Sequence, residues 1–419
     1  MMVLALVLAA AVQAGAVESV IVHGNHTTPT ADVLALAGEI VGHEATDALL
    51  TEVTSRLEQS GRFAGVDVRR RFLSLDDASR VLLVIVVDEH EGISDNDLTP
   101  GPLKRFTAGA MWLPVLSYQE GYGFTYGAQF SFVDRLGPRS RISVPLTWGG
   151  ERQASLEVER AFTGRGVSRL AGGGGIARRE NPFYGIGDTR RSLWGRAETA
   201  PLGWLRAGAG ARRALVSFGA LEDTLVTAGL DVAIDTRRDP ALPRNAVYAS
   251  AGVDHLGFDA SSLPDAAGAS GATASRRVTL DARGYLGLVG QTVLAIRAQS
   301  ITASRPLPAF EQQLLGGVSS LRGHDVGSRV GDNLAAVSLE FLAPVTSPLT
   351  LAHAGIKLFV DRGVVYAAGQ SLADQRLDWG YGAGVFLNAT VLSFGVDIGW
   401  REGRSTPNAH VQLGLRLTR

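Results

Sequence analysis

Residues 313–344 read QLLGGVSSLRGHDVGSRVGDNLAAVSLEFLAP, a glycine-rich loop followed by a strand. The loop places Arg322 between small residues. In the strand, apolar and polar residues alternate, and Glu340 lies on the polar face. Asp361 lies on the polar face of the next strand, together with Lys357 and His353. An Arg-Gly pair in a loop is often only a turn, so the meaning of Arg322 depends on the rest of the chain.

Length and composition exclude several classes of protein. The chain has 419 residues, enough for two or three ordinary domains or for one small domain and one large architecture. A hydrophobic fraction of 45% excludes wholesale disorder. The 40 basic and 41 acidic side chains give a net charge of -1, so we expect no nucleic-acid partner. The absence of cysteine excludes disulfides, thiolate nucleophiles and cysteine zinc sites.

Residues 1–16 have the pattern of a cleaved export signal. Residues 1–12 are wholly apolar, and the small-residue sequence Gln-Ala-Gly-Ala follows at residues 13–16. No basic residue precedes the apolar run, which departs from the usual signal. A short anchoring helix is the alternative, although twelve apolar residues fall below the roughly 20 that span a bilayer.

Residues 105–419 consist of segments of about ten residues in which apolar and polar positions alternate, as in strands. Clear examples are residues 226–235, 277–283 and 392–400. We count about sixteen such strands, each with one face suited to hydrocarbon and one suited to water. A soluble sandwich shows the same alternation, so the connections must distinguish the two folds.

The connections alternate between long and short. Those after odd-numbered strands are long, and we assign them to residues 178–189, 257–274, 302–332 and 363–378. Those after even-numbered strands are short, as at residues 287–290 and 388–390, and the turn at Gly150 is an exception. This parity is typical of an outer-membrane barrel, with short periplasmic turns and longer outer loops. We therefore predict a transmembrane β-barrel of about sixteen antiparallel strands.

Tryptophan positions favour the same fold. Five of the six tryptophans are predicted near strand ends, where an aromatic girdle lies at each membrane interface: Trp112, Trp148, Trp204, Trp379 and Trp400. Ordinary hydrophobic filling of a core is the alternative. A barrel of this size is too wide for side chains alone to fill, so something must occupy its lumen.

Residues 17–92 predict a separate α+β domain. A strand at residues 20–22 precedes two helices, and Val53 and Leu57 recur at helical spacing in the second. Two further strands follow Gly61, and residues 93–104 form a linker to the barrel.

Several motifs in this arrangement resemble those of the BamA/TamA superfamily of outer-membrane assembly and translocation proteins. The N-terminal order, with Gly24-Asn25 after the first strand and Gly61-Arg62-Phe63 before the second, is similar to a POTRA domain. Three barrel motifs carry most of the resemblance: Leu321-Arg322-Gly323-His324, Ser338-Leu339-Glu340-Phe341-Leu342-Ala343-Pro344 and Phe359-Val360-Asp361-Arg362-Gly363. The resemblance covers nearly the whole mature chain.

The resemblance implies a lock inside the barrel. In this family the long loop folds into the lumen, so Arg322 and Gly323 would bind Glu340 and Asp361 on the wall, with Leu321 and His324 as possible packing residues of the loop. A guanidinium suits this role because it donates bidentate hydrogen bonds to carboxylates and stays charged. Here His324 replaces the family's usual aromatic, which predicts pH-sensitive seating of the loop. Residues 410–419 also lack the usual aromatic at the C-terminus.

The sequence contains none of the common catalytic motifs. G-x-S-x-G, a phosphate-binding G-K-[ST] loop and H-E-x-x-H are all absent, and the 8 histidines are scattered. We therefore expect no enzymatic activity, no metal, no cofactor and no nucleotide. The glycine run at residues 172–175 is better explained by close backbone approach in a barrel wall.

Two classes of function remain. In the first, the protein lies in the outer membrane of a Gram-negative bacterium, in contact with its lipids, and assists insertion or translocation of proteins. A single periplasmic POTRA domain would then bind unfolded β-barrel clients by strand addition, and the seam between first and last strands would open. In the second, the same scaffold is a passive pore or a surface antigen. The single POTRA domain and the unusual C-terminal strand are consistent with the second class, because relatives that insert proteins typically carry several such domains. The family resemblance favours the first class.

Overall fold

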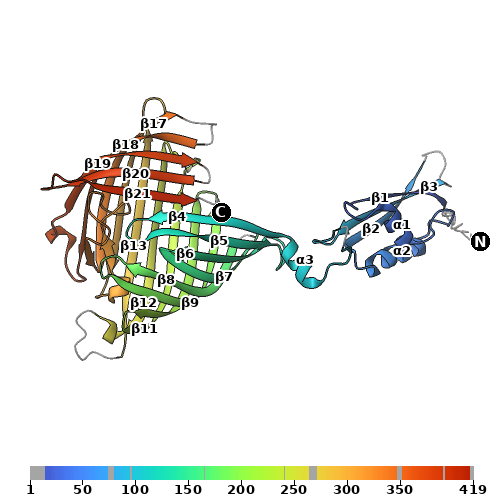
Figure 1. Ribbon diagram of the computed structural model, residues 1–419, viewed down its shortest axis with the longest axis horizontal. Coiled ribbons are helices and arrows are strands. Elements are labelled where there is room, and N and C mark those ends of the chain that lie inside the picture. The colour runs from blue at the N-terminus through green and yellow to red at the C-terminus, as the bar shows by residue number, and fades with distance from the viewer. Residues whose placement is uncertain are drawn as a thin grey trace, which may run out of the picture. The chain divides into compact units, whose positions relative to one another are not determined.

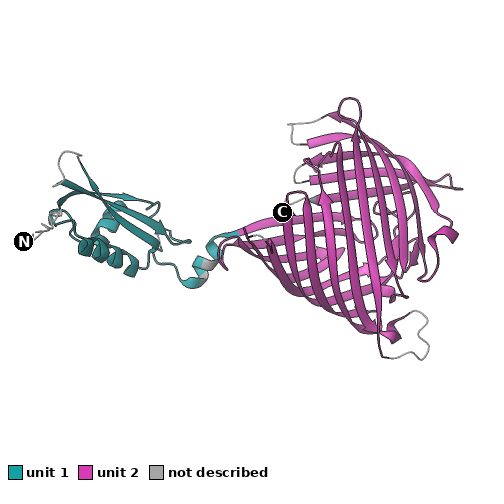
Figure 2. Ribbon diagram, turned by 180° about the vertical axis from the view of Figure 1, so that it is seen from behind, with its two compact units in different colours: residues 1–110 teal, residues 111–419 magenta. Residues whose placement is uncertain are grey.

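The computed structural model describes residues 15–73, 80–94, 97–164, 166–239, 241–263, 271–346, 352–389 and 392–415. Residues 1–14 of the predicted signal peptide lie outside these ranges. The chain divides into two compact units, residues 1–110 and residues 111–419 (Figure 2). None of the helices in the described residues is both long enough and apolar enough to cross a membrane.

The N-terminal unit is a three-stranded sheet with two helices packed on it. Its elements are β1 (Ala16–His23), α1 (Thr30–Ala37), α2 (Asp47–Gln59), β2 (Phe63–Phe72), β3 (Arg80–Glu89) and α3 (Pro102–Ala108). The strand order is β1-β3-β2, with β1 parallel and β2 antiparallel to β3. The order strand, helix, helix, strand, strand is the one predicted. Helix α3 was not predicted, and it overlaps the predicted linker at residues 93–104.

A small hydrophobic core holds this unit together. Thr46 caps α2 by accepting a hydrogen bond from the Leu49 amide at 3.3 Å. The buried face of α2 then packs Val53 and Leu57 into a core that includes Leu83 of the central strand. The helical spacing in the sequence therefore marks the buried face correctly.

The second unit is a closed barrel of sixteen antiparallel strands, as predicted (Figure 1). Its strands are β4 (Ala110–Gln119), β5 (Gly123–Val133), β6 (Ser140–Gly149), β7 (Glu151–Ala161), β8 (Arg169–Asn181), β9 (Ile186–Leu202), β10 (Leu205–Phe218), β11 (Leu221–Asp235), β12 (Ala246–Asp259), β13 (Ala272–Gly287), β14 (Val293–Ala303), β17 (Asn333–Thr346), β18 (Ala352–Tyr366), β19 (Asp378–Ala389), β20 (Leu392–Arg401) and β21 (Asn408–Leu415). The last strand, β21, closes the barrel against β4.

Alternation along each strand separates the two faces of the wall. On β10, Leu215 is 49% exposed, whereas Ala214 and Val216 on either side of it are buried inside. Leu193 on β9 and Leu230 on β11 face outward like Leu215 and are 71% and 66% exposed. The wall therefore presents an apolar outer surface, which is the pattern of a lipid-facing barrel.

The tryptophans mark both open ends of the barrel. We call the end where β4 begins rim A and the opposite end rim B. Because neighbouring strands are antiparallel, Trp112 and Trp204 lie at rim A, and Trp148, Trp379 and Trp400 lie at rim B. All five lie within two residues of a strand end, where an aromatic girdle meets the membrane interface.

The predicted parity of the connections holds for only half of the barrel. Around rim B, residues 260–271, 304–332 and 367–377 are long connections, as predicted. Residues 178–189 are not a loop: β8 and β9 continue through most of them, with a turn at 182–185. The connection at rim A between β11 and β12, residues 236–245, is longer than a short turn. Charged residues at the ends of β8 and β9 interrupt the alternating pattern from which strands were predicted. Strand ends that lie outside the lipid need no apolar alternation.

Residues 304–332, which we call the inner loop, fold into the barrel from rim B. The loop contains two 3-residue strands that form a hairpin, β15 (Gln313–Leu315) and β16 (Arg329–Gly331). Before the hairpin, Leu307 and Phe310 pack against Phe218 and Leu256 on the inner wall. The inner loop is therefore a packed element and not a free connection.

Candidate functional site

The tip of the inner loop is a tight turn that fixes the backbone around Arg322. The Ser320 hydroxyl bridges Gly316, accepting from its amide at 2.9 Å and donating to its carbonyl at 3.0 Å. The Gly317 amide donates to the His324 carbonyl at 2.8 Å. Leu321 is fully buried in a cluster with neighbouring wall residues. Leu321 thus anchors the turn and directs the next residue toward the wall.

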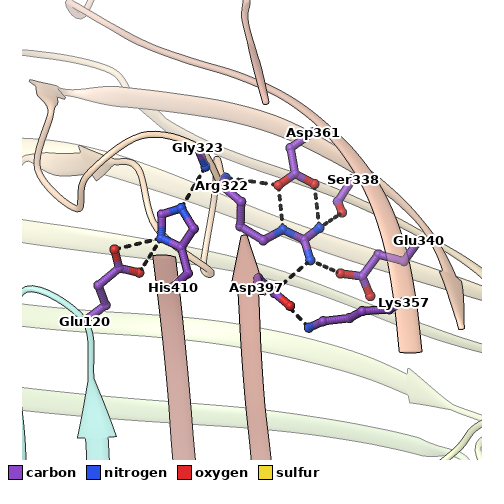
Figure 3. Close-up of polar contacts among 9 residues, drawn as sticks. All are labelled: Glu120, Arg322, Gly323, Ser338, Glu340, Lys357, Asp361, Asp397 and His410. Carbon is purple, nitrogen blue, oxygen red and sulfur yellow. Dashed lines mark hydrogen bonds and ion pairs between the residues drawn. The ribbon is translucent and has the colours of Figure 1, made fainter. Parts of the chain in front are cut away.

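Arg322 binds carboxylates from three strands (Figure 3). Its Nε and Nη2 donate to the two oxygens of Asp361, each at 2.7 Å, and its backbone amide donates to Asp361 Oδ2 at 3.0 Å. Nη1 donates to Glu340, and it lies 3.3 Å from Asp397 Oδ2. Nη2 also donates to the Ser338 hydroxyl at 2.9 Å. The guanidinium therefore joins β17, β18 and β20.

An aromatic ring and two glycines shape the space for Arg322. The guanidinium carbon lies 3.7 Å from the centroid of the Phe359 ring, within the range of a cation–π contact. A Cβ at Gly380 would lie 1.8 Å from the Arg322 carbonyl oxygen, so only glycine fits there. Gly323 itself has φ +86°, and a Cβ on it would lie 2.5 Å from the Trp400 carbonyl oxygen.

The cluster is buried and negatively biased. Arg322, Asp361 and Asp397 are 3%, 2% and 1% exposed. Lys357 adds a second cation, with Nζ 2.9 Å from Asp397 Oδ2. Two cations therefore face three carboxylates, because Glu340 also belongs to the cluster. Burial alone would lower the pKa of Arg322, but the hydrogen bonds and charges of these acids raise it, so this loop residue stays protonated.

A second contact ties the loop to both strands of the seam, the junction of β4 and β21. The Gly323 amide donates to Nε2 of His410 on β21 at 2.8 Å, and His410 is fully buried. Because Nε2 accepts this bond, the ring proton is on Nδ1, which donates to the Glu120 oxygens at 2.7 and 2.8 Å. Glu120 directly follows β4. We call Gly323, His410 and Glu120 the bracket, and Figure 3 shows it beside the arginine cluster.

The structure brings together the predicted residues Arg322, Gly323, Glu340 and Asp361. Leu321 packs beside them. His324 is buried on the far side of the turn, where Nε2 lies 3.2 Å from the Trp379 carbonyl oxygen, and burial lowers the pKa of this loop residue. Lys357 was expected on the same polar face as Asp361 but not as a member of the cluster. The other members of the cluster and the bracket were not predicted: Glu120, Ser338, Phe359, Asp397 and His410. Strand parity identifies the lumen-facing ones, because Lys357 and Phe359 share a face with Asp361.

A second anchor holds the beginning of the loop against the opposite part of the wall. Arg190 on β9 donates to Glu311 at 2.7 Å and to the Phe310 carbonyl at 2.6 Å. Arg277 on β13 donates to the other Glu311 oxygen at 2.9 Å. This anchor was not predicted from the sequence. Together the two anchors attach the loop to wall strands from β9 to β21.

Comparison with known proteins identifies the family. Residues 123–417 match the model of the Omp85 superfamily domain. The chain belongs to the Omp85 superfamily. This confirms the predicted resemblance to BamA and its relatives, and barrels of the Omp85 family lie in the bacterial outer membrane. No curated protein sequence matches the chain.

A solved structure shows the same fold at low sequence identity. BamA from Haemophilus ducreyi lacking POTRA domains 1–3 matches with a TM-score of 0.61 and 14% identity, over 95% of this chain and 84% of that chain. CdiB from Escherichia coli matches with a TM-score of 0.49 and 12% identity, over 96% of this chain and 76% of that one. Within the part of this Omp85 chain that the structure describes, no group of three or more metal-ligating side chains is placed to hold a metal ion.

Proposed function

We propose that this Omp85 protein assists the insertion or translocation of proteins at the bacterial outer membrane, and that its N-terminal unit is a POTRA domain in the periplasm. The observation that carries this proposal is the seam between β4 and β21. A barrel that releases or admits a client strand sideways needs one junction that is weaker than the others.

The seam is short in backbone pairing. Among the described residues, β21 pairs with β4 at two positions, Leu413 with Tyr118 and Gly414 with Ser117. On its other side, β21 pairs with β20 along its whole described length, from Asn408 to Leu415. A cavity of about 740 Å³ lies in the lumen beside the seam. Few backbone hydrogen bonds therefore need to break for the seam to part, and space lies next to it.

The N-terminal unit offers an edge for strand addition. One edge of its sheet, β1, is partly covered, since Val17 exchanges backbone hydrogen bonds with His43 and Gly42. Strand β2 forms the other edge and pairs only with β3 among the described residues. Phe72 at the end of β2 is 56% exposed. An extended client would find backbone donors, acceptors and an apolar side chain there.

A passive pore receives less support from the same geometry. The inner loop is attached to the wall at Glu311 and again at Arg322, on widely separated strands. A segment fixed at both places narrows the rim B end of the lumen. The alternative of a pore or surface antigen would be supported by steady solute conductance without client insertion.

The absence of native cysteine makes a disulfide test specific. Ser117→Cys combined with Gly414→Cys places a pair across the seam at partnered positions. The full-length protein is reconstituted in liposomes, oxidised, and supplied with an unfolded β-barrel client. We expect insertion to stop when the pair is oxidised and to return on reduction.

A control pair tests whether any cross-link is harmful. Gly395→Cys with Gln412→Cys joins β20 to β21, which are already paired. This pair should leave insertion unchanged. Full insertion by the oxidised seam pair would refute the proposed opening.

A further inference from the structure

A row of five arginines and one histidine faces outward from the barrel close to rim B. Its members lie on the strands from β7 to β13 except β11, and we call them the basic belt: Arg152, Arg178, Arg191, Arg213, His255 and Arg276. All six side chains are exposed. Each lies at most five residues from the rim B end of its strand.

The outward direction of these side chains follows from their neighbours. Arg191 adjoins Arg190, which reaches into the lumen to bind the inner loop. Arg191 therefore points away from the lumen, as does its cross-strand partner Leu215. Arg213 is opposite Leu193, which is 71% exposed on the outer wall.

Strand register places the belt residues in two groups, one on β7 to β10 and one on β12 and β13, with β11 between them. Arg152 is the direct cross-strand partner of Arg178, and His255 is the partner of Arg276. Arg178 pairs with Thr189, two residues from Arg191 on the same face. Cross-strand and diagonal neighbours lie about 5–8 Å apart. Such spacing lets a single polyanion contact two or three guanidinium groups.

Nothing in the described part of the protein neutralises this belt. None of its six side chains takes part in a hydrogen bond or ion pair there, whereas lumen arginines such as Arg196 and Arg283 bind aspartates. Three acids, Glu180, Glu222 and Asp259, also occupy outward-facing positions, but each lies nearer to rim B than the belt residues of its neighbouring strands. On the side that faces rim A, the belt arginines therefore have no acidic side chain beside them.

The belt lies toward one end of strands that include some longer than the hydrocarbon is thick. Strand β9 has 17 residues, which at about 3.3 Å rise and 45° tilt span roughly 40 Å. The apolar band of such a barrel is only about 25 Å tall, so the ends of the long strands reach past the hydrocarbon. Outward arginines are tolerated there, and they bind phosphate bidentately.

An apolar groove adjoins the belt on the side toward rim A. It has a volume of about 790 Å³, and glycines and alanines of β9 to β11, including Ala209 and Ala211, form its floor. Leu170, Leu230 and Val253 border it, and it extends to His255 and Arg276. A groove of this composition suits an acyl chain that leads down from a headgroup at the belt.

We propose that the basic belt and the adjoining groove bind a phosphorylated glycolipid of the outer leaflet. The phosphates contact the arginines and an acyl chain lies in the groove. The choice of leaflet rests on the proposed function, because a periplasmic N-terminal unit places rim A inside and rim B outside. Protease access to the N-terminal unit in intact and permeabilised cells tests that orientation independently of lipid binding.

Native mass spectrometry of the full-length protein in detergent measures the binding. The probes are diphosphorylated lipid A, monophosphorylated lipid A, phosphatidylethanolamine and inorganic phosphate. We expect the affinity to fall in that order of lipids. The variant Arg178→Gln/Arg191→Gln/Arg213→Gln should bind diphosphorylated lipid A at least roughly tenfold more weakly, given the attraction of each arginine to anionic headgroups.

A charge-matched control separates the belt from general electrostatics. Arg179→Gln/Arg206→Gln/Arg212→Gln removes three charges from the lumen face of the same wall and should bind lipid A like the wild type. Equal binding by the belt variant, or equal affinity of the wild type for phosphatidylethanolamine, would overturn the proposal. Displacement of lipid A by an equal concentration of inorganic phosphate would show a free-anion site and also overturn it.

A second variant tests the groove without changing charge. Ala211→Trp fills part of the groove from the outer face. It should weaken binding of lipid A while leaving heat-resistant folding of the barrel intact. Unchanged affinity in a folded Ala211→Trp protein would contradict the placement of the acyl chain.

Discussion

Replacing Arg322 with alanine should release the tip of the inner loop while leaving the barrel folded. The change leaves Asp361 and Asp397, both nearly fully buried, with Lys357 as the remaining nearby cation. Removing one partner of a buried ion pair costs about 3–5 kcal/mol, because the remaining charge is uncompensated. The contact with Glu340 adds little, since that side chain is 28% exposed.

Hydrogen exchange of backbone amides measures this cost. In Arg322→Ala, residues 316–328 should open about 10²- to 10³·⁵-fold more often, since roughly 1.4 kcal/mol corresponds to a factor of ten. Amides near Glu311 should keep their protection because the second anchor remains. Arg329→Ala is the control: its pair with Asp378 is exposed at the arginine, so the effect should stay below about 1 kcal/mol. Equal exchange of residues 316–328 in Arg322→Ala and wild type would refute the lock.

Three further outcomes follow from single sites. Gly323→Ala should destabilise the seated loop tip by about 1–3 kcal/mol of strain, because φ is +86° and the Trp400 carbonyl oxygen blocks a Cβ. Amide exchange of the tip should therefore become faster, and exchange at the wild-type rate would contradict this. Burial lowers the pKa of His324 below 6.5, so the seating of the inner loop should weaken as pH falls below 6.5. Protease cleavage of the loop measures this, and His324→Gln should remove the pH dependence. Burial alone would raise the pKa of Glu89, but hydrogen bonds from Thr28 lower it below 4.5. The N-terminal unit should therefore lose stability as pH falls below 4.5. Urea melts of Glu89→Gln should lack that loss.

The fold was predictable because lipid and water impose period-two alternation on every strand. Segments such as residues 226–235 and 392–400 are strands in the structure with the expected faces. The prediction was wrong at residues 178–189, where strands extend beyond the apolar band and charged side chains remain solvated on both faces. The alternation of apolar and polar residues therefore indicates the apolar part of a strand and not its full hydrogen-bonded length.

Arg322, Glu340 and Asp361 were predictable as a group because two signals coincide, strand parity and a family motif. Asp397 satisfied only parity, and many lumen residues share that property. Its contact depends on how the closed barrel sets β20 beside β18, which a single sequence does not reveal. Glu311 had neither signal, because its partners lie on β9 and β13, more than thirty residues away in sequence.

The lock and the seam are physically linked at Gly323. Its amide donates to His410 on the last strand, and His410 donates to Glu120 at the end of the first. The next residue toward the N-terminus is Arg322, whose guanidinium holds the loop to the wall. A movement of the loop tip therefore removes the hydrogen bond that orients His410, and a parting of β4 from β21 pulls Glu120 away from the same ring. In the proposed function, seating of the loop and closure of the seam would each stabilise the other, because both depend on one buried histidine whose two nitrogens are used on opposite sides.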